Sequence, residues 1–409
     1  MKQSRFSFSF MMTTTIVGVF VIYMMFQYNS KYNIQRQEKL QALENQLKAI
    51  LQSKPHREEI SMHSTITWPA IRQYEPGYPK QLYQPLLSLI EAWNPDNPDP
   101  PAIFHETLPH FNYTDPVERA MAEAYRNAEV PFKIYNVPEF TKTSHLWTDE
   151  YLVKAFHAHG EQHVEKSKNN HFMFWAMRGR NVKDYTPPTE VVQLKFENWL
   201  KVAYEADQNK APNTTSHLYF MTGSPPRDYG NTFVARDLPL FSTRSNNFFI
   251  TNVGANKGIQ CRFSMRGIIA ETHYDSGKNM VLMLKGAKRY ILTPPHTCKK
   301  LALITDVNHP SFRHSVIDWS DLDQARAHDF ANVDAIDTIV REGEVLFIPS
   351  FWMHYIVSLQ YAIQCNSRSG PPSENQGADE ISECMSLDMS ALGMKKMKAK
   401  KRRENSASK

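Results

Sequence analysis

The sequence His273-Tyr274-Asp275 has the residue types and spacing to bind a metal ion in this chain of 409 residues. Side chains at positions i and i+2 of a β-strand point to the same face, so His273 and Asp275 could contact one ion. A histidine on a neighbouring strand would complete the two-histidine, one-carboxylate triad of non-haem Fe(II) oxygenases, which leaves metal positions open for a cosubstrate and dioxygen.

A histidine two residues before an acidic residue is a weak signal by itself, because the chain contains 16 histidines. Three other matches lie in polar segments, where we expect helices or linkers and solvated surface pairs: His56-Arg57-Glu58, His159-Gly160-Glu161 and His163-Val164-Glu165. The context of His273 differs. It precedes an apolar hairpin pattern, with strands expected near 279–284 and 288–292 and a turn at Lys285-Gly286-Ala287.

A second block supplies the candidate third ligand. The strand pattern Gly343-Glu344-Val345-Leu346-Phe347-Ile348-Pro349 is followed by Ser350-Phe351-Trp352-Met353-His354. A lone histidine in an apolar stretch is ordinarily a core residue. The position of His354, between one expected strand and the next, favours a ligand instead.

Taken together, these blocks resemble a JmjC or cupin-8 domain, and in pattern they are most similar to the asparaginyl hydroxylases that act on hypoxia-inducible transcription factors. The resemblance covers about residues 130–370 and extends to Asn308-His309-Pro310 and Val316-Ile317-Asp318-Trp319. It implies a mainly β fold with flanking helices, a double-stranded β-helix (jelly-roll, cupin) domain. It also implies Fe(II) as the cofactor, with 2-oxoglutarate and O₂ as cosubstrates.

The resemblance assigns roles residue by residue. The metal ligands, which are also the catalytic residues, would be His273, Asp275 and His354. Lys288 matches the lysine that pairs with the distal carboxylate of 2-oxoglutarate, and Tyr219 matches the tyrosine that assists it. Asn279 and Asn366 match amides near the cosubstrate and the metal, although a turn or strand-end role is equally compatible with each.

Two departures leave the cosubstrate pocket open. The family usually has Thr or Ser three residues before the first ligand, where this chain has Ala270. Thr272 is nearby and is kept as a cosubstrate candidate, although it would lie on the opposite face of a regular strand. Arg368 replaces a family aromatic and resembles an arginine anchor of other 2-oxoglutarate oxygenases. Either Lys288 or Arg368 could therefore anchor the cosubstrate, and a surface salt bridge is also compatible with Arg368.

The elements that would position these residues follow from periodicity. Helices are expected over 116–128, 148–159 and 191–207, and short strands over 131–137, 281–284, 290–292, 345–348 and 355–359. Short strands separated by Gly, Pro and Asn clusters favour a sandwich or barrel. We therefore predict a helical or irregular extension over 55–130, an oxygenase-like domain over 131–370 and a disordered basic tail over 371–409.

Charge and cysteine content exclude other classes. The formal net charge of the chain is +5, and residues 395–409 alone carry +7. Residues 1–394 therefore carry a net charge of −2. The body is nearly neutral, which argues against a specific nucleic-acid partner. Four cysteines without a CxxC pair argue against a structural zinc site and leave one or two disulfides open.

The N-terminal segment predicts a membrane anchor. Residues 6–30 carry no charge, and we expect a transmembrane signal anchor over 10–28 behind a short cytoplasmic tail over 1–9. A cleaved signal peptide is the alternative. A helical stalk is expected over 29–54, with possible weak dimerisation. Sequons at Asn112 and Asn213 favour a lumenal body, hence a single-pass type II protein of the ER or Golgi rather than a nuclear or cytosol-facing one.

Function is then expected to be membrane-anchored Fe(II)- and 2-oxoglutarate-dependent hydroxylation of protein side chains. The sequence does not specify the protein or peptide substrate. Two alternatives remain: a catalytically silent cupin that serves as a binding or scaffold module on a membrane, and a cupin that uses another metal for a small-molecule reaction.

Overall fold

The computed structural model describes residues 81–157, 160–370 and 377–387, together with Glu38, Gln41 and Asn45. The described strands and helices all belong to the larger of two units, residues 62–409. The predicted anchor over 10–28 and nearly all of the predicted stalk lie outside the described residues. Within the described part of the chain, every helix is too short or too polar to cross a membrane.

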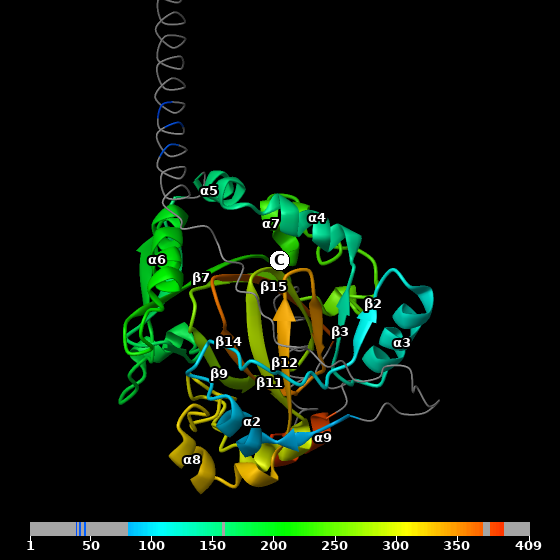
Figure 1. The fold of residues 1–409 in the computed structure, drawn as a ribbon, viewed down its shortest axis with the longest axis vertical. Coiled ribbons are helices and arrows are strands. Elements are labelled where there is room, and N and C mark those ends of the chain that lie inside the picture. The colour runs from blue at the N-terminus through cyan, green and yellow to red at the C-terminus, as the bar shows by residue number, and fades with distance from the viewer. Residues whose placement is uncertain are drawn as a thin grey trace, which may run out of the picture. The chain divides into compact units, whose positions relative to one another are not determined.

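Two β-sheets form the centre of the domain (Figure 1). In spatial order, the six-stranded sheet contains β1 (Gln84–Pro85), β12 (Asp334–Arg341), β11 (Ala287–Thr293), β14 (Met353–Ser358), β9 (Ile269–Tyr274) and β5 (His171–Phe172). The nine-stranded sheet contains β2 (His110–Asn112), β3 (Phe132–Tyr135), β13 (Val345–Ile348), β10 (Lys278–Lys285), β15 (Ala362–Ser369), β8 (Ile259–Ser264), β7 (His217–Ser224), β4 (Gln162–Ser167) and β6 (Glu190–Leu194).

The two sheets share a buried apolar core. One cluster takes side chains from both sheets, including Val281 and Leu346 of the larger sheet and Leu292 and Ile356 of the smaller one. Burial of apolar surface from facing sheets is the main stabilising term in such a fold. The predicted mainly β, cupin-like fold with flanking helices is thus confirmed.

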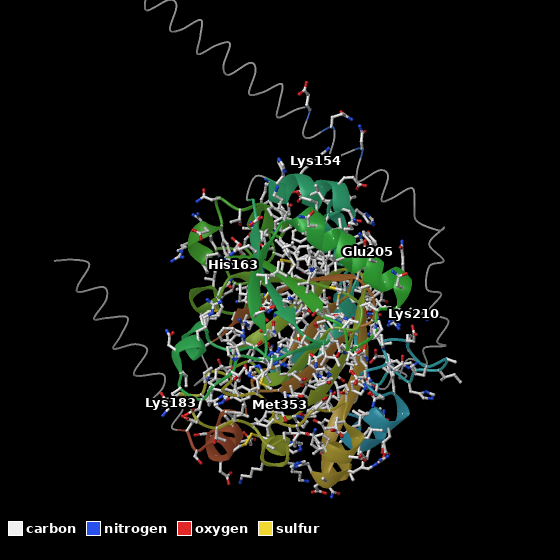
Figure 2. The ribbon with its side chains drawn as sticks, turned by 90° about the vertical axis from the view of Figure 1, so that its left-hand side faces the viewer. Lys154, His163, Lys183, Glu205, Lys210 and Met353 are labelled. Atoms are coloured by element: carbon white, nitrogen blue, oxygen red, sulfur yellow. A yellow bond between two sulfur atoms is a disulfide. The ribbon has the colours of Figure 1, made fainter. Side chains whose placement is uncertain are left out.

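Helices lie around the sheets, as Figure 1 shows. They are α2 (Leu86–Ala92), α3 (Pro116–Asn127), α4 (Pro138–Leu146), α5 (Asp149–His157), α6 (Phe196–Asn209), α7 (Phe233–Asp237), α8 (Leu322–Ala327) and α9 (Ala378–Met385). The side chains of Lys154 on α5, Glu205 on α6 and Lys210 directly after α6 are exposed, whereas Met353 of β14 is buried (Figure 2).

Local sequence explains several boundaries. Helix α3 begins where the Asp115 side chain accepts hydrogen bonds from the backbone N–H groups of Val117 and Glu118, at 2.8 and 3.0 Å. The β10–β11 hairpin turns at Gly286, which has φ of +75°. A Cβ atom at this position would collide with the carbonyl oxygen of Tyr361, so only glycine fits there.

Two expectations about elements were wrong. Residues 191–207 do not form one helix: β6 covers Glu190–Leu194 and pairs with β4, and α6 begins only at Phe196. The β-branched pair Val191-Val192 suits an edge strand, and this local preference prevails over the helical periodicity that follows. The tail is not disordered throughout, because Ala378–Met385 forms α9.

All four cysteines form disulfides. Cys261 of β8 and Cys365 of β15 are directly opposed in register and bonded, and Cys298 is bonded to Cys384 of α9. The second bond fastens α9 against the turn over Pro295–Lys300. Both disulfides close loops of roughly a hundred residues, a length at which a cross-link removes much conformational freedom from the unfolded chain.

Candidate metal centre

The side chains of His273, Asp275 and His354 converge at one end of a cavity between the sheets. We call them the cavity triad. Each offers one ligand atom, and these atoms all lie within 4.8 Å of one another. His273 of β9 and His354 of β14 are direct cross-strand neighbours, with ring centroids 4.3 Å apart. The structure therefore brings together the three residues predicted as metal ligands.

A bulge in β9 sets which side chains enter this cavity. His273 pairs with His354, but the next matched pair is Ala270 with Ile356, so Glu271 and Thr272 stand opposite the single residue Tyr355. Ala270 and His273 consequently both line the cavity although they are three positions apart. In a regular strand they would point to opposite faces.

Backbone carbonyls orient both histidines of the cavity triad. The Nδ1 atom of His273 lies 2.7 Å from the carbonyl oxygen of Glu271, and that of His354 lies 3.1 Å from the carbonyl oxygen of Trp352. When Nδ1–H donates to a carbonyl, Nε2 carries the free lone pair. Each ring thus presents Nε2 as its metal-binding atom.

Burial and charge set the protonation states that a metal requires. Burial lowers the pKa of His273 well below its usual value and lowers that of His354, so both rings are neutral at pH 7. Burial alone would raise the pKa of Asp275, but Arg368 and Arg313 hold it well below its usual range. The guanidinium of Arg313 donates to Asp275 Oδ1 at 3.0 Å, and Arg368 donates to the same oxygen.

The predicted cosubstrate residues Lys288 and Tyr219 form a second buried group. The Lys288 Nζ atom donates to the Tyr219 hydroxyl at 3.2 Å, and both side chains are buried. Burial, together with the positive charge of Arg262, lowers the pKa of Lys288 to about 7. Tyr219 and Arg262 line the same cavity as the cavity triad.

The two predicted asparagines connect to the triad in series. Asn366 donates through Nδ2 to Asn279 Oδ1 at 2.9 Å, and Asn279 donates to Asp275 Oδ2 at 3.2 Å. Both line the cavity. They therefore help to fix the orientation of the carboxylate of Asp275.

The two remaining cosubstrate candidates differ in position: Arg368 lines the cavity, whereas Thr272 does not. Arg368 is bonded to Asp275 and, at 3.1 Å, to Gln260, so its guanidinium is engaged beside the triad. Thr272 turns to the opposite face from its neighbour His273, and its buried hydroxyl has no hydrogen-bond partner in the described structure. The bulge gives the cavity-facing position to Ala270, so the structure does not bring Thr272 together with the other candidates.

Several cavity residues were missed by the sequence reasoning. Glu165 belongs to a motif that we expected on a helix or linker surface, yet it lies on β4 and lines the cavity, while His163 of the same motif is exposed. His314 is stacked on His273 with ring centroids 5.0 Å apart, and its buried Nε2 atom has no hydrogen-bond partner in the described structure. A usable signal was the position of Arg313-His314, directly before the 316–319 block.

The fold and the site define a cupin-type protein with a candidate metal centre. Comparison with known families agrees: residues 118–367 match the model of the cupin-like domain (Cupin_8). This match covers more than half of the chain, so the protein belongs to the cupin-like, JmjC-type family.

Individual relatives share shorter segments. The chain is 30% identical over 105 residues to tRNA wybutosine-synthesizing protein 5 of Danio rerio, which covers 26% of this chain and 30% of that protein. It is 28% identical over 105 residues to the Homo sapiens protein of the same name, with 26% and 31% covered. JmjC domain-containing protein D of Dictyostelium discoideum is 29% identical over 105 residues, with 25% and 23% covered. The chain thus spans less than a third of the length of these relatives.

Proposed function

We propose that this protein is an Fe(II)- and 2-oxoglutarate-dependent dioxygenase. The observation that carries the proposal is the convergence of two neutral imidazoles and one ionised carboxylate in a cavity that is also lined by Tyr219, the hydrogen-bond partner of the buried Lys288. The donor set suits Fe(II), because imidazole and carboxylate ligands on one side of the ion leave positions for other ligands. His273, Asp275 and His354 would hold the metal.

The surroundings of Lys288 support it as the anchor of 2-oxoglutarate. Its amine is buried, and no carboxylate lies within salt-bridge distance of it among the described residues. A buried cation is costly unless an anion neutralises it. A dicarboxylate cosubstrate would provide that anion, whereas Arg368 already has Asp275 as its partner.

When both are bound, Fe(II) and 2-oxoglutarate would allow O₂ to oxidise a substrate C–H bond, and 2-oxoglutarate would be decarboxylated to succinate in the same reaction. The chain's own residues would bind and orient. Lys288 and Tyr219 would hold the distal carboxylate, and Asn279 would hold the carboxylate of Asp275 in place. Arg313 and Arg368 would keep Asp275 ionised.

We further propose that the substrate is a protein side chain and that the protein is a type II membrane protein of the secretory pathway. Two disulfides are typical of an oxidising compartment, which supports a lumenal body. Sensitivity of the expressed protein to glycosidase, lost when Asn112→Gln and Asn213→Gln are combined, would support this orientation. Absence of any glycan, with the protein facing the cytosol in a protease-protection assay, would contradict it.

A second candidate substrate is RNA. It rests on relatives named for tRNA wybutosine synthesis, and Arg262, Arg313 and Arg368 around the cavity are compatible with a phosphate-bearing ligand. The near-neutral body argues for protein instead. The same turnover assay with tRNA in place of peptides separates the two.

The decisive assay is conversion of 2-oxoglutarate to succinate by the purified full-length protein with Fe(II), with His273→Ala and Lys288→Ala in parallel. We expect metal-dependent conversion by the unmodified chain and loss in both variants. Lack of both turnover and 2-oxoglutarate binding would leave the catalytically silent cupin as the better account.

A further inference from the structure

A second group of histidine and carboxylate side chains lies outside the cavity. It comprises His171 of β5, Glu271 of β9, Asp318 of the segment before α8 and Asp96 of the segment after α2; we call it the outer cluster. One ligand atom from each of His171, Glu271 and Asp318 lies within 4.8 Å of the other two, as in the cavity triad. Asp96 Oδ1 lies 3.5 Å from His171 Nε2.

The outer cluster carries an excess of negative charge. Three carboxylates surround one imidazole: His171 Nδ1 lies 2.5 Å from Glu271 Oε1, and Nε2 lies 3.8 Å from Asp318 Oδ2. Even a protonated His171 leaves a net charge of about −2. Among the described residues, no Lys or Arg forms an ion pair with Asp96, Glu271 or Asp318.

The neutral contacts of the outer cluster satisfy only part of its oxygens. Asn170 donates to Asp96 at 3.2 Å, and Ser320 donates to Asp318 at 2.7 Å. Neither contact adds positive charge. Partly buried carboxylates repel one another unless a cation lies between them, because the reduced local dielectric strengthens their interaction.

An independent observation comes from Tyr355, which stacks on Trp319 and is fully buried. Its hydroxyl has no hydrogen-bond partner by distance and angle within the described structure. On β14, Tyr355 stands opposite the bulge residues Glu271 and Thr272, and Trp319, on which it stacks, is the chain neighbour of Asp318. Tyr355 therefore belongs to the buried surroundings of Glu271 and Asp318.

We propose that the outer cluster binds a divalent cation of the Mn²⁺ or Zn²⁺ class, separate from the metal of the cavity triad. One imidazole nitrogen with several carboxylate oxygens is a donor set that both ions accept. The ion would replace the proton of His171, and its charge of +2 would offset most of the −3 of the three carboxylates. The side chains are 18% exposed at His171 and 35% at Asp318, which leaves a path for the ion and for water ligands.

Such an ion would connect four segments that are distant in sequence. Asp96, His171, Glu271 and Asp318 come from separate parts of the chain, and Glu271 belongs to the β9 bulge whose carbonyl orients His273. Bound only to the folded state, the ion stabilises that state by mass action. Its structural effect is to fasten the periphery of the domain to the strand that carries the first metal ligand.

The test uses the full-length chain with His273→Ala and His354→Ala, so that the cavity triad cannot bind a metal and the outcome is independent of the proposed oxygenase activity. After treatment with a chelator, Mn²⁺ and Zn²⁺ are titrated separately by calorimetry, and thermal unfolding is followed with and without each ion. We expect one ion per chain and a higher unfolding temperature with at least one of the two metals.

Three further variants in this background decide the ligands. We expect Asp318→Asn and His171→Gln each to weaken binding at least tenfold and to abolish the thermal shift. Asp99→Asn, a carboxylate paired with Arg266 outside the cluster, should leave both unchanged. The metal-free unfolding temperature of each variant verifies that it is folded. Failure of the background chain to bind either ion, or undiminished binding by both ligand variants, would overturn the proposal.

Discussion

Two groups of the same residue types lie on the two sides of one strand, and their surroundings make them chemically different. Both the cavity triad and the outer cluster combine histidine with carboxylate, and both take a residue from the β9 region. In the triad, burial lowers the pKa of His273, and arginines neutralise the carboxylate. In the outer cluster, burial lowers the pKa of His171, but Asp96 and Glu271 prevail and raise it to about 10.

The difference shows that residue type alone does not decide what a cluster binds. Neutral imidazoles beside a charge-balanced carboxylate form a site that can accept an ion and still leave room for an anionic cosubstrate. A surplus of carboxylates without arginine forms a negatively charged site that favours a cation and disfavours an anionic cosubstrate. The bulge at Glu271 and Thr272 separates the two environments within three residues.

The largest effect is expected from loss of a triad ligand. His354→Ala removes one metal donor, and we expect 2-oxoglutarate turnover to fall by about 100-fold or more, since even indirect contacts of metal ligands contribute 10–100-fold. Succinate formation measures this. The exposed Lys183→Ala is the matched control and should keep full activity. If turnover is retained in His354→Ala, the cavity triad is not the catalytic metal site, and the contrast with the outer cluster loses its basis.

The second largest effect is expected from loss of either arginine beside Asp275. We expect Arg313→Ala to weaken Fe(II) binding about 10–100-fold, because it removes a charge partner of a ligating carboxylate. Arg368→Ala should do the same while 2-oxoglutarate affinity at saturating metal stays within a few-fold. Equilibrium binding of each ligand separates these effects. Selective loss of 2-oxoglutarate binding in Arg368→Ala would transfer the anchor role from Lys288 to Arg368.

A pH dependence sharpens the role of Lys288. Its pKa of about 7 means that the free protein loses this positive charge as pH rises above 7. Binding of a dianion then requires proton uptake, so affinity for 2-oxoglutarate should fall by up to about tenfold per pH unit above 7. Calorimetry between pH 6.5 and 8.5 (about two units) measures it. Lys288→Arg should bind with little pH dependence, and a flat profile in the unmodified protein would contradict the assignment.

The smallest expected effect is on the pKa of His171 and on folding stability, in the outer cluster without metal. Because the pKa of His171 is raised, its charge interactions stabilise the fold below pH 6.5, and this stabilisation is lost as pH rises through about 10. Asp96→Asn removes one of the carboxylates, so the pKa should move back toward 6.5. NMR titration of chelator-treated protein follows this, and the change in stability should stay within about 1 kcal/mol for a partly exposed pair. An unchanged pKa would show that Asp96 does not belong to the cluster.

Residues carried by regular strands could be predicted from the sequence. His273 and Asp275 were predicted from their spacing before an apolar hairpin, and His354 from its place between two expected strands. Lys288 of β11 was assigned through the family resemblance. Asn279 and Asn366 were found through the family resemblance, and the structure brings them together.

Residues positioned by irregular backbone or by long-range register could not be predicted. Thr272 was assigned to the cosubstrate, but nothing local in the sequence reports the bulge that turns it away. Arg313 lies in a loop with φ of +71°, and its contact with Asp275 spans 38 residues. The disulfide Cys261–Cys365 depends on the pairing of β8 with β15, which periodicity within one strand does not specify.

The most direct test of the central claim is anaerobic binding of 2-oxoglutarate to the full-length chain loaded with Fe(II), compared with the metal-free chain and with Asp275→Ala. If the cavity triad and Lys288 form one site, one 2-oxoglutarate should bind per chain, and removal of either the metal or the Asp275 carboxylate should weaken it at least tenfold. Binding that is absent, or that is equally tight without metal and in Asp275→Ala, would contradict the account.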